Sequence, residues 1–225
     1  MDPWIGLGMV GGLGALVAAH ALWLRPLCMR WGATDAEAHG PWPGDDLVPA
    51  PKTHGTHVIT IHARAEEIWP WLVQIGQDRA GFYSYDWLER LFGFHMRNVD
   101  RVNKEWQRLQ PGDPLRLHPA ATPLEVVTVE ANRCLVTAGG RELQRGVDLR
   151  DPSVMMTHRY AAYSWAFILV PQGDGTTRFI ARLRATWPRS VFDSLRNWLF
   201  MEGAHLIMQL EMNRGLKRRA ELPPT

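Results

Sequence analysis

The segment 190–219 constrains the fold most strongly, because it combines a long apolar helical pattern with polar side chains on the apolar side. It contains no proline, and its Val, Leu and Trp residues recur at the spacing of one helix face. Glu202, His205, Gln209 and Asn213 project within or beside that stripe. Burying a charge is unfavourable unless the charge is paired or hydrated. We therefore expect a helix that packs on a sheet and also faces an internal cavity.

The composition is that of a globular protein. With 225 residues, of which 46% are hydrophobic and 21% charged, the chain fits one domain of ordinary size plus an appendage. The net charge is +2 and no dense Lys/Arg run is interleaved with aromatic residues, so we expect no nucleic-acid partner. Cys28 and Cys134 lack metal-ligand spacing, and no carboxylate or cysteine completes a ligand set with His54, His57 and His62. We expect neither a metal nor another cofactor.

Residues 4–24 form an uncharged stretch close to the N-terminus, with a tryptophan at each end. A helix of about 20 residues is roughly 30 Å long, which is enough to span the core of a bilayer. Arg25 and Arg30 follow directly, and the positive-inside bias places the remaining chain in the cytoplasm. We expect residues 1–25 to be a single-pass transmembrane anchor in the cell membrane, with the globular domain cytoplasmic.

Small residues recur at every fourth position within this stretch. Gly8 and Gly12 form one row, and Gly11, Ala15 and Ala19 form another. Such rows let two membrane helices approach closely, so the pattern predicts a homodimer through the transmembrane helix. The alternative is a span that is simply rich in glycine and alanine and does not self-associate.

Residues 26–55 are rich in Gly, Pro, Asp and His without periodicity, which predicts a linker. The globular domain then covers residues 56–222. Gly173, Asp174 and Gly175 separate its last two strands and are typical of a hairpin turn. The expected elements are strands at 56–62, 115–117, 124–129, 134–138, 163–170 and 177–187, short helices at 66–75 and 85–92, and the closing helix at 190–219.

The last expected strand has two different faces. Phe179 and Leu183 belong to an apolar face on which small and large residues alternate, which would leave room for a ligand. The opposite face carries Arg178, Arg182 and Arg184, which we expect to be solvated. The residues expected to line a ligand cavity are Trp165, Phe167, Leu183, Trp198, Glu202, His205 and Gln209.

Four segments carry a resemblance to a known superfamily: WPWLVQIG at 69–76, GFYSYDWLE at 81–89, EWQRLQPGD at 105–113 and EGAHLIMQLEMNRGLKRRAE at 202–221. In these segments the chain resembles the START-like, polyketide cyclase/dehydrase (SRPBCC) superfamily, and within it a membrane-tethered actinobacterial branch of unknown function. The resemblance implies an α+β helix-grip fold, in which a curved antiparallel sheet surrounds a long C-terminal helix and leaves a cavity. It implies no single reaction, because relatives include lipid carriers, hormone receptors and cyclases.

Glu202 and His205, with Gln209, are the first candidates for chemistry. They form a polar cluster on the closing helix that would orient a ligand or act as acid and base. The alternative is that Glu202 pairs with an arginine or a backbone amide inside a mostly filled core.

Tyr83 and Tyr85 are the second candidates, because a phenol next to the Asp86 carboxylate would hydrogen-bond a carbonyl or hydroxyl group of a ligand. The favoured alternative is structural. Ser84 or Asp86 would cap the second short helix while the tyrosines pack on it.

Three functions fit these features. The first is membrane-tethered binding or transport of a hydrophobic small molecule, lipid-like or polyketide-like, with residues 141–159 as a candidate lid. The second is a cyclase/dehydratase-type enzyme, in which Glu202 or His205 abstracts a proton and Tyr83 or Tyr85 hydrogen-bonds the developing enolate. The third is a filled domain that only contacts partner proteins. A catalytic base would have a perturbed pKa, whereas a carrier needs none.

Overall fold

The computed structural model describes residues 12, 15, 18–91, 97–118, 122–140, 146–148, 151, 160–188 and 190–222. Within them, six strands form one antiparallel sheet in the order β1-β6-β5-β4-β3-β2. The strands are β1 (Thr53–Ile61), β2 (Pro114–Leu115), β3 (Leu124–Glu130), β4 (Cys134–Gly139), β5 (Ala162–Pro171) and β6 (Thr177–Thr186). The helices before β2 are η1 (His20–Leu24), α2 (Arg25–Met29), α3 (Asp35–His39), η2 (Asp45–Leu47), α4 (Ala65–Val73), α5 (Asp86–Leu91) and η3 (Lys104–Trp106).

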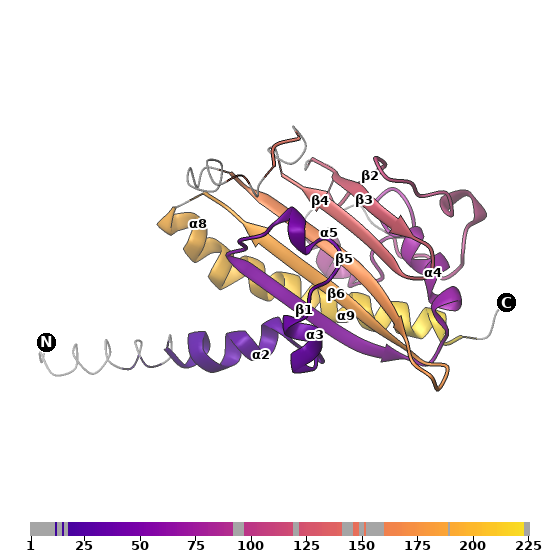
Figure 1. The fold of residues 1–225 in the computed structure, drawn as a ribbon, viewed down its shortest axis with the longest axis horizontal. Helices are drawn as coiled ribbons and strands as arrows, with labels where there is room; N and C mark the ends of the chain where they lie inside the picture. The colour runs from indigo at the N-terminus through magenta and orange to yellow at the C-terminus, as the bar shows by residue number, and fades with distance from the viewer. Residues whose placement is uncertain are drawn as a thin grey trace, which may run out of the picture.

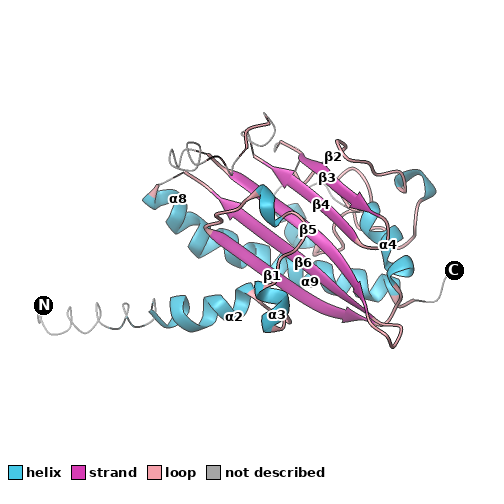
Figure 2. Ribbon diagram, viewed as in Figure 1, coloured by secondary structure: helices cyan, strands magenta, loops and turns pink. Residues whose placement is uncertain are grey.

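The predicted closing helix is confirmed, and it crosses one face of the curved sheet (Figures 1 and 2). It consists of α8 (Val191–Arg196), a π-helical turn η4 (Asn197–Met201) and α9 (Glu202–Ala220), which follow one another without a break. The main hydrophobic core lies between this face, α4 and α9, and includes Phe167, Phe179, Met212 and Leu216. A curved antiparallel sheet with a long C-terminal helix across it is a helix-grip arrangement.

Most expected strands lie within a few residues of their predicted ends. β1 begins at Thr53, which is earlier than predicted, and the strand expected at 115–117 is the short β2. The Gly-Asp-Gly turn does join β5 to β6, whose pairing runs from Ala162–Thr186 to Pro171–Thr177. The segment 141–159, named above as a candidate lid, lies almost wholly outside the described residues.

The prediction of a linker at 26–55 is wrong, because this segment packs on the outer face of the sheet. A second apolar cluster lies on that face, and Ala33, Trp42 and Leu47 cover it. A capping box at Thr34 starts α3, since the Thr34 hydroxyl accepts from the N–H of Glu37. The Pro- and Gly-rich composition therefore serves sharp turns in a packed segment.

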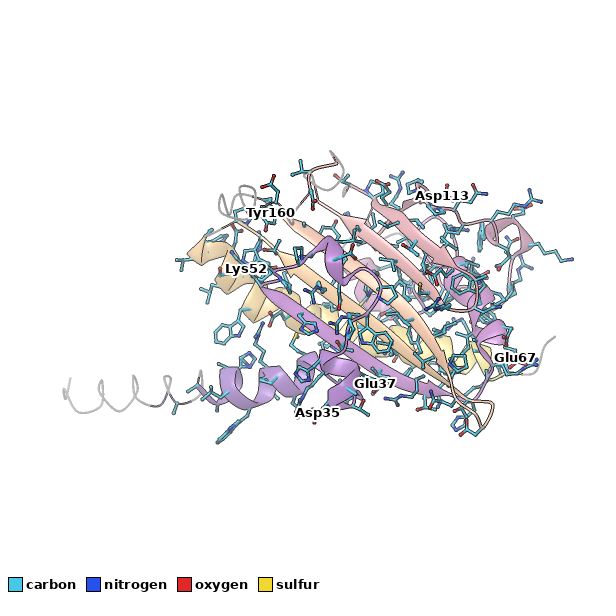
Figure 3. The ribbon with its side chains drawn as sticks, in the orientation of Figure 1. Asp35, Glu37, Lys52, Glu67, Asp113 and Tyr160 are labelled. Carbon is cyan, nitrogen blue, oxygen red and sulfur yellow. The ribbon has the colours of Figure 1, made fainter. Side chains whose placement is uncertain are left out.

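The arginines expected to be solvated lie under this packed segment. Arg182 is only 3% exposed and forms two bonds with the Asp45 carboxylate, at 2.6 and 2.9 Å. Arg178 pairs in the same way with Glu37 of α3, which is labelled in Figure 3. Acidic residues distributed along 26–55 are thus the partners of basic residues on β6, and each buried guanidinium is neutralised.

Most of the expected transmembrane range 4–24 lies outside the described residues. In the described part of the chain, no helix is long and apolar enough to cross a membrane. The described residues 18–29 are helical and lie beside β1 and the closing helix (Figure 1).

Close packing at Gly215 sets the distance between α9 and the loop that follows α4. A Cβ atom at this position would lie 2.1 Å from the carbonyl oxygen of Tyr83. The Tyr83 backbone cannot move aside as a flexible side chain could, so only glycine is accommodated where α9 packs against it.

We expect Gly215→Ala to destabilise the protein by about 1–3 kcal/mol, because the methyl group forces α9 away from the Tyr83 backbone. Gly203→Ala is the matched control on the same helix, since nothing lies within 4 Å of its Cβ position. That variant should be neutral or stabilising by up to about 1 kcal/mol, through helix propensity. Urea unfolding of the purified full chain measures both. Equal effects at the two positions would contradict the packing argument.

Candidate functional site

Glu202 is held in an ion pair rather than directed at a ligand. Its Oε2 and Oε1 atoms accept from Nε and Nη2 of Arg25 at 2.6 and 2.7 Å, and its side chain is 7% exposed. The hydroxyl of Thr53 also donates to Oε1. Both oxygens are therefore engaged by residues from α2 and β1. This is the alternative that the sequence left open for Glu202, namely pairing with an arginine.

His205 lies one turn further along α9, where it faces His57 of β1. The two ring centroids are 5.9 Å apart. His57 is fully buried, and its Nε2 lies 3.1 Å from the carbonyl oxygen of Cys28. A carbonyl only accepts hydrogen bonds, so this contact assigns the proton to Nε2 and leaves Nδ1 as an acceptor.

Two buried nitrogens of this pair have no hydrogen-bond partner among the described residues. They are Nδ1 of His57 and Nε2 of His205. A buried polar atom without a partner is unfavourable by about 1–3 kcal/mol, so such atoms are rare in folded proteins. Two of them on facing rings mark a place for a water molecule or for a polar group of a ligand.

Both imidazoles are neutral at neutral pH. Burial lowers the pKa of His57 to about 4, against a smaller opposing effect of its bond to the Cys28 carbonyl. Burial also lowers the pKa of His205 to about 3, and the neighbouring His57 lowers it further. A neutral imidazole offers one donor and one acceptor, so the pair suits an uncharged group such as a hydroxyl.

Gln209 and Trp165 join this cluster, but their polar groups already have partners. The indole N–H of Trp165 donates to Oε1 of Gln209 at 2.9 Å, and Nε2 of Gln209 donates to Oδ1 of Asn213 at 2.7 Å. The Trp165 ring meets His205 edge to face, with centroids 6.0 Å apart. Gln209 therefore orients the tryptophan, and the indole face forms an apolar wall beside the histidines.

Phe167 and Leu183 flank Trp165 on the face of the sheet that meets α9. Leu183 is its cross-strand neighbour on β6 and is half-buried. Phe167 is fully buried between Trp165 and Phe179, at centroid distances of 4.6 and 6.1 Å. Aromatic side chains thus fill the sheet–helix space around Phe167, and Leu183 and His205 lie on the other side of Trp165.

Trp198 lies apart from this cluster. Its ring meets His20 of the N-terminal helix edge to face, at a centroid distance of 5.0 Å. Trp198 and Glu202 thus both face the N-terminal helix, whereas Trp165, Phe167, Leu183, His205 and Gln209 come together between the sheet and α9.

Tyr83 has a structural role. Its hydroxyl donates to the Trp71 carbonyl at 2.9 Å and accepts from Nε2 of Gln74 at 3.0 Å. Burial raises its pKa, and the Arg219 guanidinium lies over its ring at 4.5 Å. Tyr83 is therefore tied down at the far end of α9.

Tyr85 is partly exposed and lines a surface hollow of about 360 Å³ that lies outside the sheet–helix interface. Ser84 and Asp86, the predicted capping residues, both make contacts outside α5. Ser84 donates to the Met208 carbonyl, and Asp86 accepts from the side-chain amide of Asn98. Neither tyrosine is brought to His205, so the structure separates the proposed proton-abstracting and enolate-binding groups.

Sequence reasoning missed His57 as a site residue, although strand alternation contained the signal. His57, Ile59 and Ile61 alternate along β1 and share the face that meets α9. Arg25 was assigned to the membrane boundary, so its pairing with Glu202 was missed as well.

The sequence matches no family model and no curated protein. Among solved structures it is similar to a Helicobacter pylori protein (10% identity, TM-score 0.46, covering 80% of this chain and 95% of that one). It is also similar to protein MLL2253 from Mesorhizobium loti (15% identity, TM-score 0.41, covering 76% and 99%) and to CalU16 from Micromonospora echinospora (13% identity, TM-score 0.31, covering 75% and 83%).

Replacing Arg25 by methionine should destabilise the protein by about 2–3 kcal/mol, because the Glu202 carboxylate stays buried without its cation. Arg30→Met is the control, since the Arg30–Asp35 pair is 47% and 86% exposed. That variant should change the free energy of unfolding by less than about 1 kcal/mol. Adding Glu202→Met to Arg25→Met should restore most of the loss, because no unpaired charge remains. Equal losses for Arg25→Met and Arg30→Met would show that the buried pair is dispensable.

The stability of the protein should fall as the pH drops from about 6.5 toward 5. The unfolded chain takes up protons on His57 and His205 there, while the folded state keeps both neutral, with a limiting slope of about 1.4 kcal/mol per pH unit for each ring. His57→Leu/His205→Leu should remove most of this slope, and the remainder comes from His54, whose pKa burial lowers to about 4. The exposed control His39→Gln should leave the slope unchanged. Urea unfolding between about pH 6.5 and 5 measures this pH dependence of the unfolding free energy. An unchanged slope in the double variant would contradict the burial of two neutral imidazoles.

Proposed function

We propose that the chain binds a hydrophobic small molecule, lipid-like or polyketide-like, between the sheet and α9. The observation that carries this proposal is the pair of nitrogens on His57 and His205 for which the described residues supply no hydrogen-bond partner. Ligand sites of this kind combine an apolar wall with a few polar groups that orient the ligand. Trp165 and Leu183 supply the wall, and the two neutral imidazoles supply the polar contact.

The polar contact favours an uncharged group on the ligand. His57 Nδ1 accepts a hydrogen bond, so the ligand must donate one there. A hydroxyl donates to His57 and still offers lone pairs to His205 Nε2. A carboxylate has no proton to donate, and desolvating it beside neutral rings is unfavourable. We therefore expect an alcohol or phenol on an otherwise apolar molecule.

We further propose that the protein belongs to the SRPBCC superfamily and that residues 4–24 hold the domain at the cytoplasmic side of the cell membrane. The superfamily proposal rests on the four resembling segments and the helix-grip arrangement, and the anchor proposal rests on the uncharged stretch and on the basic residues that follow it. An anchor raises the effective concentration of the domain near a lipid source. The small-residue rows of the same stretch support a homodimer.

The cyclase/dehydratase alternative is weaker on this geometry. The Glu202 carboxylate is paired with Arg25, and the Tyr83 hydroxyl is bonded inside the fold. His205 has a pKa lowered to about 3, which makes it a poor proton acceptor at neutral pH. Hydrogen bonding to a ligand requires no change in the protonation state of these groups, whereas catalysis by proton transfer does.

The test is native mass spectrometry of the full chain after delipidation and incubation with a bacterial lipid extract. We expect a defined ligand mass to be retained, and His205→Leu to weaken retention roughly 10-fold, which corresponds to about one hydrogen bond. Full chain is needed because a fragment starting at Ala50 would lack Arg25. His39→Gln is the control with an exposed histidine.

A clean apo mass with no uptake by the unaltered chain would reject the binding proposal and favour a domain that only contacts proteins. Uptake that His205→Leu leaves unchanged would place the ligand elsewhere and show that the imidazole nitrogens only hold water.

A further inference from the structure

The first turns of the closing helix expose large apolar side chains. Val191 is 88% exposed, Phe192 is 74% exposed and Leu195 is 49% exposed. At 100° per residue these three span one side of α8. Asp193 lies opposite them, and its ion-pair partner Arg196, at 3.2 Å, lies at the border of the apolar side beside Phe192. The start of the closing helix is therefore amphipathic, and its apolar side lacks cover from the described residues. Such exposed groups usually mark an interaction surface.

The turns that follow this surface contact the N-terminal helix. His20 contacts Trp198, and Arg25 pairs with Glu202. Residue numbers increase together in the two contacts, so the helices run parallel there. Both helices therefore point their N-terminal ends to the same side of the domain, as Figure 1 shows.

Each of the two helices contains a π turn between its two contact residues: η1 lies in the N-terminal helix and η4 lies in the closing helix. The N–H of Arg25 donates to the His20 carbonyl, and the N–H of Glu202 donates to the Asn197 carbonyl. In a regular α-helix, positions five apart point in different directions. A wider π turn brings His20 and Arg25 toward one face, so both meet the closing helix.

From Trp198, α8 extends toward the same side of the domain to which the N-terminal end of η1 points (Figure 1). Val191 precedes Trp198 by seven residues, which is about 10 Å of helix axis. The neighbouring η1 residues Leu22, Trp23 and Leu24 are also exposed, Trp23 at 78%. Two adjacent parallel helices thus present apolar side chains at the same end of the domain.

We propose that α8 enters the headgroup and upper acyl region of the membrane leaflet that the N-terminal helix crosses. This inference rests on the proposed anchor. A bilayer crossed by the N-terminal helix would cover the exposed apolar side chains of both helices at once, because the two helices point the same way. Basic groups suit anionic headgroups at this end: Arg196 belongs to α8, and Lys52 lies at the same end of the sheet (Figure 3).

Membrane contact at α8 also defines how a ligand reaches the proposed site. His205 follows Trp198 by seven residues on the same continuous helix, so it lies about 10 Å from the level of the His20–Trp198 contact. A hydrophobic molecule would pass from the leaflet to the sheet–helix space over this short distance.

The test uses the full chain with Cys28→Ala and Cys134→Ala, reconstituted in phosphatidylcholine and phosphatidylglycerol vesicles. Single cysteines are introduced as Phe192→Cys, Trp23→Cys or Asp174→Cys and labelled with a polarity-sensitive fluorophore. Asp174 lies in the β5–β6 turn and is the exposed control. Nitroxide-labelled lipids should quench the labels at 192 and 23 several-fold more strongly than the label at 174.

Quenching at position 23 without quenching at position 192 would overturn the α8 proposal and leave the anchor intact. Absence of quenching at both positions would reject the anchor, and the inference with it. A label at 192 that is shielded from water, insensitive to nitroxide lipids and cross-linkable between chains would show that a second copy covers α8, which also overturns the proposal. Ligand uptake by the same preparations, measured by native mass spectrometry, reports separately on the binding function.

Discussion

The ion pair between Arg25 and Glu202 determines how three distant parts of the chain can be arranged. Glu202 begins α9, and its carboxylate lies where solvent hardly reaches it, so a cation must be present. Arg25 supplies that cation from α2, and Thr53 adds a hydrogen bond from the start of β1. The N-terminal helix can therefore neither rotate nor slide without leaving a buried charge unpaired. Its direction relative to the sheet, and the face it presents beside α8, follow from this one contact.

The same ion pair shapes the chemistry of the sheet–helix space. Because Glu202 is committed to Arg25, the polar groups left for a ligand are the neutral rings of His57 and His205, next to Trp165. Neutral groups in a desolvated place recognise shape and a single hydrogen bond more readily than they move protons. The polar residues on the apolar side of the closing helix thus differ in their roles: Glu202 pairs with a charge, Gln209 orients an indole, and His205 is the residue to which the proposed function assigns ligand contact.

Hydrophobic periodicity and turn residues were sufficient to predict the closing helix, the order of the strands along the chain and the β5–β6 hairpin, because these features depend on local sequence patterns. It failed for the segment 26–55, where Asp45 meets Arg182 from 137 positions away along the chain. Pairing over such separations leaves no trace in a hydrophobic pattern, and a Pro- and Gly-rich composition fits a packed turn as well as a tether. Within the candidate site, helical spacing identified His205 and Gln209. It could not identify His57, whose role depends on which strand faces α9.

The tight turn at Gly32 has a consequence for self-assembly. Gly32 has a φ of +73°, and a Cβ there would lie 2.1 Å from the carbonyl oxygen of Val58 on β1. The carbonyl of the preceding Trp31 accepts from the N–H of Val58 at 2.9 Å. β1 is an outermost strand, and edges of this kind recruit strands from other molecules. Here the chain blocks its own edge near the middle of β1. Domains crowded together at high concentration would therefore meet through side chains and helices, and they would be protected at this edge from fusing into a shared sheet.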